Sequence, residues 1–155
     1  MDKYTIKLPI INDEQLTDGP IYVEKSSDKT LRNKLETFAL YFQREFKYDF
    51  PQYEANEHLY NDNKYIGILF AAKAWDKVTD DIQSPYRLFG GACFRWRDGQ
   101  GHNSGWVLDW IWFHPFFRHR GVLAKHWKQL KIKFGDFCVA EPLSADMKKF
   151  LSKNN

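Results

Sequence analysis

The chain has 155 residues and a formal net charge of +3, with 23 Lys and Arg against 20 Asp and Glu. A chain of this length forms one domain and buries enough surface to fold without metal or disulfide support. Its 43% hydrophobic and 28% charged residues exclude the collagen-like, wholly disordered and disulfide-scaffold classes. Aromatic residues make up 17% of the chain, which indicates flat apolar surface for a ligand as well as for the core.

Cysteine usage and hydropathy narrow the class further. Cys93 and Cys138 lie far apart in apolar runs, without a spacing that forms a zinc site, so we expect two reduced thiols and no metal. The longest apolar stretch, 66–72, is far shorter than the roughly 18 residues of a membrane span, and no apolar signal core follows Met1. We therefore expect a cytoplasmic protein without a membrane partner. The pI of about 8.8 leaves nucleic-acid binding open without favouring it.

The first third of the chain predicts two short strands and a long helix. The strands are expected at 4–11 and 21–25, around a turn at 17–20. Ser27 or Asp28 can cap the helix, whose buried face follows from apolar residues three or four positions apart. These residues are Leu31, Leu35, Phe38, Phe42 and Phe46. A long irregular connection follows at 48–63.

The second half predicts six further elements. They are antiparallel strands at 65–75, 87–96 and 106–113, a helix that opens at Gly121, a short strand at 137–140 and a last helix that starts at Pro142 and Ser144. The order strand, helix, three strands, helix, strand, helix is that of an α+β, or mixed α/β, domain. His126 is expected at the surface or an interface, as are His58 and His102.

A strand, a basic loop, a glycine and a helix follow one another between residues 110 and 124. Arg118, His119 and Arg120 lead into the helix that opens at Gly121. A helix N-terminus offers unpaired N–H groups and a partial positive charge, so this loop is a candidate pyrophosphate site. From the residues alone, a solvated basic corner remains the alternative.

This segment resembles the acetyl-coenzyme A loop of the GCN5-related N-acetyltransferases. That loop has Arg or Gln, two residues, Gly, one residue, then Gly or Ala; Arg118 and Gly121 match it. Leu123 departs from the expected small residue, and Ala124 follows one position later. The order of elements from Tyr65 to the end is also similar to the core of that family.

The resemblance implies an acyl-CoA N-acyltransferase fold, with a central, mostly antiparallel sheet flanked by helices. It implies a single domain in which 1–27 is an extended segment, 28–63 carries the first helix and the acceptor-side loop, and 64–155 is the cofactor-binding core. Acetyl-CoA would be the co-substrate, its pantetheine arm entering between two splayed strands. The implied coenzyme-binding residues are Trp112, Phe113, Arg118, His119, Arg120, Gly121, Val122, Leu123 and Ala124.

Asp109 and Glu141 are the two candidate general bases. Strand alternation would place Asp109 beside Val107, Ile111 and Phe113, where apolar surroundings raise a carboxylate pKa. The alternative for Asp109 is a buried carboxylate bonded to an Arg or a Trp N–H, and for Glu141 an exposed loop position.

Residues 140–144, which include Glu141, are similar to the tail of the cohesin-acetylating branch, where an acidic residue before a proline serves catalysis. The chain lacks the zinc-finger cysteines that precede that branch's catalytic domain. Phe150 stands where many relatives place a tyrosine that protonates the thiolate. Ser144 could replace that tyrosine or merely cap the last helix.

The connection at 48–63 holds four carboxylates and no Lys or Arg. In the resembled family this connection lines the acceptor side, so Glu54, Glu57, Asp62 and Tyr53 are expected to bind a cationic primary amine such as a lysine side chain, a polyamine or an amine antibiotic. A solvated loop is the alternative.

A second function class also stays open. Leu123 and Phe150 favour a non-catalytic module that senses an acyl-CoA or binds RNA.

Overall fold

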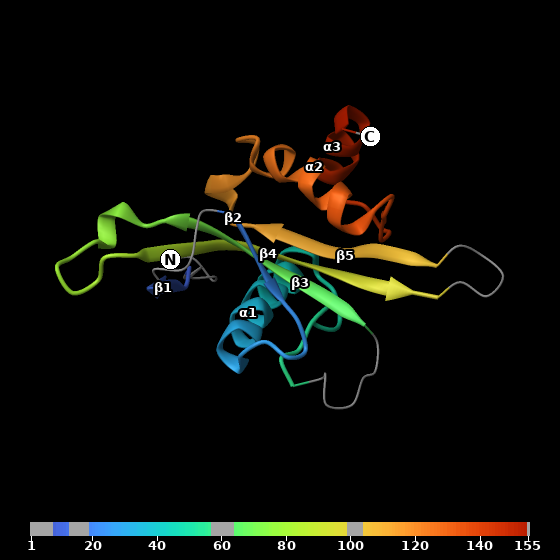
Figure 1. The fold of residues 1–155 in the computed structure, drawn as a ribbon. Coiled ribbons are helices and arrows are strands. Elements are labelled where there is room, and N and C mark those ends of the chain that lie inside the picture. The colour runs from blue at the N-terminus through green and yellow to red at the C-terminus, as the bar shows by residue number, and fades with distance from the viewer. Residues whose placement is uncertain (1–7, 13–18, 57–63, 99–103, 155) are drawn as a thin grey trace.

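The computed structural model describes residues 8–12, 19–56, 64–98 and 104–154 (Figure 1). In chain order these residues form β1 (Ile10–Asn12), β2 (Gly19–Val23), α1 (Lys29–Phe46), β3 (Tyr65–Lys73), a 3-10 turn η2 (Trp75–Lys77), β4 (Pro85–Arg97), β5 (Gly105–Phe113), a 3-10 turn η3 (Pro115–Phe117), α2 (Val122–Phe134), β6 (Cys138–Val139) and α3 (Ala145–Asn154). The fold is therefore α+β, as the sequence pattern predicts.

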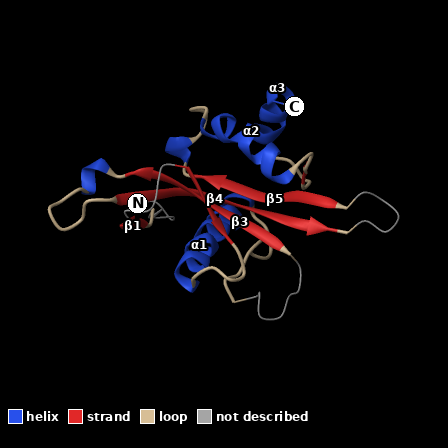
Figure 2. Ribbon diagram, viewed as in Figure 1, coloured by secondary structure: helices blue, strands red, loops and turns tan. Residues whose placement is uncertain are grey.

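The strands form one sheet in the order β2-β3-β4-β5-β6, with β1 paired to β4 (Figure 2). All pairings are antiparallel except that of β5 with β6, which is parallel. A parallel neighbour needs a crossover connection, and α2 supplies it. The sheet is thus mostly antiparallel, and its parallel edge lies next to the two C-terminal helices.

Helices cover both faces of this sheet. Figure 1 shows α1 on one face and α2 with α3 on the other. On the α1 face, Leu35 and Phe38 are fully buried and pack with Trp110 and Trp112 of β5. On the opposite face, α2 contributes Trp127, Leu130 and Phe134 to a second core, which also contains Phe94 and Leu108. Each amphipathic helix buries its apolar side against the sheet.

Most of the predicted elements are confirmed, with local corrections. α1 begins after Asp28 and buries the predicted face, but Phe46 at its last position is 39% exposed. Gly19 and Pro20, expected in a turn, belong to β2. His126 is buried on α2 rather than at the surface, with its ring 5.7 Å from that of Phe70. Cys93 and Cys138 are both free thiols, as expected.

A β-bulge interrupts the pairing of β4 with β5. Cys93 pairs with Trp110 and Phe94 pairs with Leu108, which leaves Asp109 as an extra residue. The alternation of β5 changes at this point. Leu108 and Ile111 both pack into the core under α2, whereas Trp110 packs under α1. The predicted grouping of Asp109 with Ile111 and Phe113 on one face is therefore wrong.

Candidate functional site

The edge of β5 opens immediately after the bulge. β6 pairs with β5 only at Val107 and Leu108, and Ala140 N then donates to Leu108 O at 2.9 Å. Beyond this bond the chain turns away through Glu141 towards α3. Within the described residues, β5 has no strand partner on this side from Asp109 to Phe113. The pairing of β5 with β6 thus ends at Leu108, which leaves an opening beside the second half of β5.

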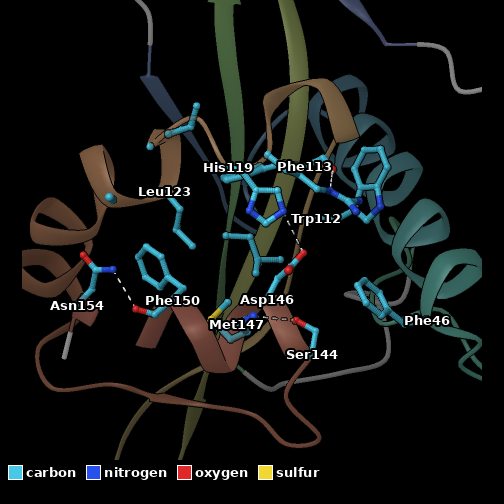
Figure 3. A pocket seen from close by; sticks show the side chains of 15 residues that line it. Phe46, Trp112, Phe113, His119, Leu123, Ser144, Asp146, Met147, Phe150 and Asn154 are labelled. Atoms are coloured by element: carbon cyan, nitrogen blue, oxygen red, sulfur yellow. Dashed lines mark hydrogen bonds and ion pairs between the residues drawn. The ribbon is translucent and has the colours of Figure 1, made fainter. Parts of the chain in front are cut away.

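A cavity of about 220 Å³ lies at this opening, bounded by α2 and α3 (Figure 3). Its wall includes every expected coenzyme-binding residue except Arg120. The residues concerned are Trp112, Phe113, Arg118, His119, Gly121, Val122, Leu123 and Ala124. Helix α3 adds residues that face them across the cavity, among them Met147, Phe150 and Asn154. The predicted loop and the last helix therefore share one site, which we call the first cavity.

The N-terminus of α2 forms part of the first cavity. Gly121 is its N-cap and has a φ of 77°, a conformation that glycine adopts without steric cost. The first intrahelical bond runs from Lys125 N to Gly121 O at 2.9 Å. The N–H groups of Val122, Leu123 and Ala124 have no acceptor inside the helix, so they can bind an anion in the cavity.

Arg120 lies outside the first cavity, contrary to the expectation. Its Nε donates to Phe116 O at 2.5 Å, and its guanidinium stacks 4.3 Å from the centre of the Phe116 ring. These contacts turn the side chain back onto the preceding 3-10 turn. Its charge lies near the helix N-terminus without entering the cavity.

Arg118 is held by Glu45 of α1, in an arrangement that we call the Glu45 clamp. Arg118 Nη1 donates to Glu45 Oε2 at 2.8 Å, and Arg118 Nη2 donates to Oε1 at 2.5 Å. Trp112 Nε1 also donates to Oε1, at 2.9 Å, while Arg118 Nε donates to Phe113 O at 2.7 Å. The guanidinium charge is therefore compensated by a carboxylate, and Arg118 fixes the loop rather than offering an unpaired cation.

The charge of Glu45 follows from these contacts. Burial alone would raise the pKa of Glu45, but the hydrogen bonds from Arg118 and Trp112 and the charge of Arg118 outweigh it, so the pKa is lowered. Sequence reasoning missed Glu45 because its partner Arg118 is 73 positions away, and an acidic residue near the end of an amphipathic helix gives no local signal.

One further contact joins the loop to α3, and another caps α3 itself. His119 Nε2 lies 3.5 Å from Asp146 Oδ2, across the first cavity. Met147 N donates to Ser144 Oγ at 3.1 Å, so Ser144 caps α3 and still has a hydroxyl proton to donate.

Two apolar residues narrow the first cavity. The ring of Phe150 packs edge-on against Trp127 at 4.9 Å, and Leu123 points towards it in Figure 3. These are the positions at which the sequence departs from the resembled family.

A second cavity of about 210 Å³ lies beside the first, at the C-terminal end of α1. It is lined by both candidate bases, Asp109 and Glu141, and by the aromatic residues Phe42, Phe46, Tyr48 and Trp110. The two cavities have four lining residues in common. These are Phe46, Ile111, Ser144 and Met147. The two cavities are therefore adjacent along β5, with these four residues between them.

Asp109 does not have the apolar surroundings that alternation predicts. Arg95 Nε donates to its Oδ2 at 2.7 Å, and Arg97 Nη2 donates to its Oδ1 at 3.2 Å. The Asp109 side chain is only 12% exposed. The bulge turns the Asp109 side chain towards Arg95 and Arg97 of β4, and both of its carboxylate oxygens accept from their guanidinium groups. This is the alternative in which a neighbouring Arg satisfies a buried carboxylate.

Glu141 differs from Asp109. Glu141 is exposed and lines the second cavity. No hydrogen bond or ion pair joins its side chain to another described residue. Of the two candidate bases, Glu141 has the available carboxylate.

Of the four expected acceptor residues, the two that the structure describes line neither cavity. Glu57 and Asp62 lie outside the described residues, and Glu54 is exposed without lining a cavity. Tyr53 is 3% exposed and its hydroxyl lies 3.1 Å from that of Tyr65. Tyr53 is thus a core residue, since its ring completes the packing under α1. The connection reaches the second cavity through Tyr48 and Gln52 instead.

Comparison with protein-family models gives no match, and a search of curated proteins finds no significant relative. Among the described residues, no helix is long and apolar enough to cross a membrane. Over the same residues, no three His, Cys, Asp or Glu side chains come together in a way that could hold a metal ion. The geometry of the two cavities is what bears on function.

Proposed function

We propose that this protein is an acetyl-CoA-dependent N-acetyltransferase that acts on a primary amine in a ternary complex. The observation that carries the proposal is the position of two adjacent cavities along the edge of β5 beyond its pairing with β6. One cavity contains a helix N-terminus behind a positive-φ glycine, and the other contains the carboxylate of Glu141, which has no partner among the described residues. A two-substrate transfer needs two sites that share a boundary, so that the reacting atoms are held together.

The first cavity supplies the groups that a coenzyme A would need. The first-turn N–H groups of α2 would hold the pyrophosphate. His114 N donates to Phe89 O on β4, so by alternation the backbone groups of Ile111 and Phe113 face the open edge. They would bond to the amides of the pantetheine arm. Phe113 O also accepts from Arg118 Nε, which places the Glu45 clamp directly beside this path.

Acetyl-CoA supplies an acetyl group activated as a thioester. The neutral amine nitrogen attacks its carbonyl carbon, a C–N bond forms and the C–S bond breaks, which gives an amide and a thiolate. Glu141 takes the proton that the amine loses. Ser144 lines both cavities, and its hydroxyl hydrogen-bonds to the thiolate. Phe150 has no proton to give, so water protonates the thiolate, either directly or through Ser144, which regains a proton from water as it gives one.

A calorimetric titration with acetyl-CoA tests the coenzyme site. Gly121→Asp adds a carboxylate at the N-terminus of α2, where no atom blocks a Cβ but φ is positive. We expect affinity to fall by about ten-fold or more, because a like charge opposes the pyrophosphate. Gly135→Asp is the matched control, since Gly135 also has a positive φ, of 70°, at the other end of α2.

Gly135→Asp should leave acetyl-CoA affinity unchanged. A separate assay on the wild type, which measures release of the coenzyme A thiol with a panel of amines, should show turnover. Equal affinity of both folded variants and the wild type would overturn the coenzyme site.

A module that binds an acyl-CoA without turnover is the second candidate function. The observation that favours it is the packing of Leu123 towards Phe150 inside the first cavity, which narrows the space for the coenzyme and leaves no phenol for the thiolate. Tight acetyl-CoA binding with no thiol release for any amine would support this alternative over the transferase.

A further inference from the structure

The second cavity carries charges of opposite sign from strands on either side of β5. Arg97 is the last residue of β4, and Glu141 follows β6 by two positions. Because the sheet order is β4-β5-β6, these residues reach the cavity from opposite neighbours of β5. Both line the same cavity.

Arg97 is held in place by a chain of hydrogen bonds that leads from the protein interior. Arg95 Nη2 donates to Gln52 O at 2.9 Å and Arg95 Nε to Asp109 Oδ2 at 2.7 Å. Asp109 Oδ1 then accepts from Arg97 Nη2 at 3.2 Å. This chain fixes the position of a guanidinium whose side chain is still 63% exposed.

Arg97 keeps hydrogen-bonding capacity after its contact with Asp109. The two oxygens of Asp109 are divided between Arg95 and Arg97, so Arg97 reaches only one of them. An arginine has five N–H donors, and within the described residues Arg97 uses one of them in a side-chain hydrogen bond. The remaining donors can form a bidentate bond with a second carboxylate at the cavity.

Aromatic rings line the cavity near these charges. Phe42 packs against Tyr48 with ring centroids 5.3 Å apart and against Trp110 at 5.9 Å. Phe46 adds a further ring at 4.9 Å from Phe42 and is 39% exposed. This wall suits an apolar or aromatic side chain, because binding it would remove exposed ring surface from water.

We propose that the acceptor is an amino acid with an apolar or aromatic side chain, whose carboxylate binds Arg97 and whose amino group binds Glu141. The inference rests on the proposed function, since it identifies the amine that the second cavity takes. A polyamine or a lysine side chain would place a cation beside the exposed guanidinium of Arg97 without a group that binds it. An acceptor that carries its own carboxylate matches both charges of the cavity.

Binding measurements with three small molecules test this assignment without any need for turnover. The probes are phenylalanine, phenethylamine, which lacks the carboxylate, and 3-phenylpropionate, which lacks the amine; the same three molecules built on leucine cover a smaller side chain. We expect at least one of the amino acids to bind the full chain about ten-fold or more tightly than either of its partial analogues in NMR titrations.

Two substitutions test which protein charge binds the carboxylate of the amino acid and which binds its amino group. Arg97→Gln should abolish the advantage of the amino acid over phenethylamine and leave phenethylamine binding unchanged. Glu141→Gln should abolish its advantage over 3-phenylpropionate. Arg87→Gln is the matched control, because Arg87 also lies on β4 and also pairs with an aspartate, Asp76, at 2.9 Å, but lines neither cavity.

The possible failures are separable. If neither amino acid binds more tightly than its partial analogues, or if spermidine binds more tightly than both, the assignment of the acceptor is overturned while acetyl-CoA binding and transfer to other amines can still hold. If the amino acid is bound as described but acetyl-CoA is not, the transferase function fails and the ligand class of the second cavity stands.

Discussion

Asp109 and Glu141 line one cavity, but among the described residues only Asp109 has ion-pair partners, so the same kind of substitution should affect them differently. Asp109→Asn removes the charge that two guanidinium groups share, and we expect it to lower the free energy of unfolding by about 2 kcal/mol. Glu141→Gln touches an exposed group without a described partner and should leave thermal unfolding unchanged. It should reduce kcat by about 10²-fold, the usual contribution of a general base.

Denaturant unfolding and steady-state rates measured on both variants check this pair. The reverse pattern, a stable Asp109→Asn variant without activity beside a fully active Glu141→Gln variant, would transfer the role of base to Asp109.

The two thiols should differ in reactivity. Cys93 is fully buried between the sheet and α1, and burial raises the pKa of its thiol to about 12. The thiolate is the reactive form, so at neutral pH Cys93 is protonated as well as inaccessible, whereas Cys138 is exposed. An aromatic disulfide reagent should therefore titrate one thiol in the native protein and two in denaturant.

Cys138→Ser is the control for this assay, since it should remove the fast-reacting thiol and leave the buried one. Two fast thiols in the native wild type would show that the packing around Cys93 opens readily.

At the scale of elements, the Glu45 clamp joins the C-terminal end of α1 to the loop that precedes α2. Glu45→Gln keeps the size and one acceptor but loses the charge, so we expect a destabilisation of about 1 kcal/mol, given that the pair is partly exposed to solvent. Because the pKa of Glu45 is lowered on folding, the stabilisation is complete above its ordinary value of 4.5 and disappears as the pH falls through the lowered value.

Unfolding free energies of the wild type and Glu45→Gln should therefore converge below pH 4.5. Glu36→Gln serves as the control, because Glu36 is on the same helix and its carboxylate accepts from Ala55 N instead of a cation. A stability difference that is independent of pH would remove the ionic component from the clamp.

Strands β4 and β5 approach each other closely at Gly90. A Cβ on Gly90 would clash with Phe113 Cδ1 and lie 2.5 Å from the carbonyl oxygen of Trp112. The backbone oxygen cannot move aside without disturbing the strand pairing, so Gly90→Ala should cost about 2 kcal/mol. It should also change the first cavity, which Trp112 and Phe113 line.

Gly105→Ala, at the start of β5, has no heavy atom within 4 Å of the added methyl group and should be within about 0.5 kcal/mol of the wild type. Thermal unfolding of both variants compares them, and equal midpoints would contradict the close approach.

At the scale of the whole molecule, the order of the elements could be predicted because each depends on a local period. The helical spacing of apolar residues such as Leu35 and Phe38 predicts α1, and the three apolar runs predict β3, β4 and β5. The face to which Asp109 points could not be predicted, because the bulge depends on how β5 pairs with β4. The roles of Glu45 and Arg97 could not be predicted for a related reason, since they depend on partners on other elements.

The position of the candidate site was partly predictable. The loop before α2 carried its own signal in Arg118 and Gly121, and the structure places most of that loop at the first cavity. The resemblance and the acidic charge of the connection at 48–63 predict that it lines the acceptor side, but Tyr53 is buried in the core. A net charge over a segment says nothing about which of its side chains fold inwards.

The two cavities lie at different places, the first between α2 and α3 and the second at the end of α1, and they have four lining residues in common. For the proposed transferase, this gives each product its own exit. Free coenzyme A would compete with acetyl-CoA alone, and the acetylated product would compete with the amine alone. Neither substrate has to pass through the site of the other, so the substrates should add in random order. Initial-rate lines should then intersect rather than run parallel, and each product should inhibit competitively against its own substrate.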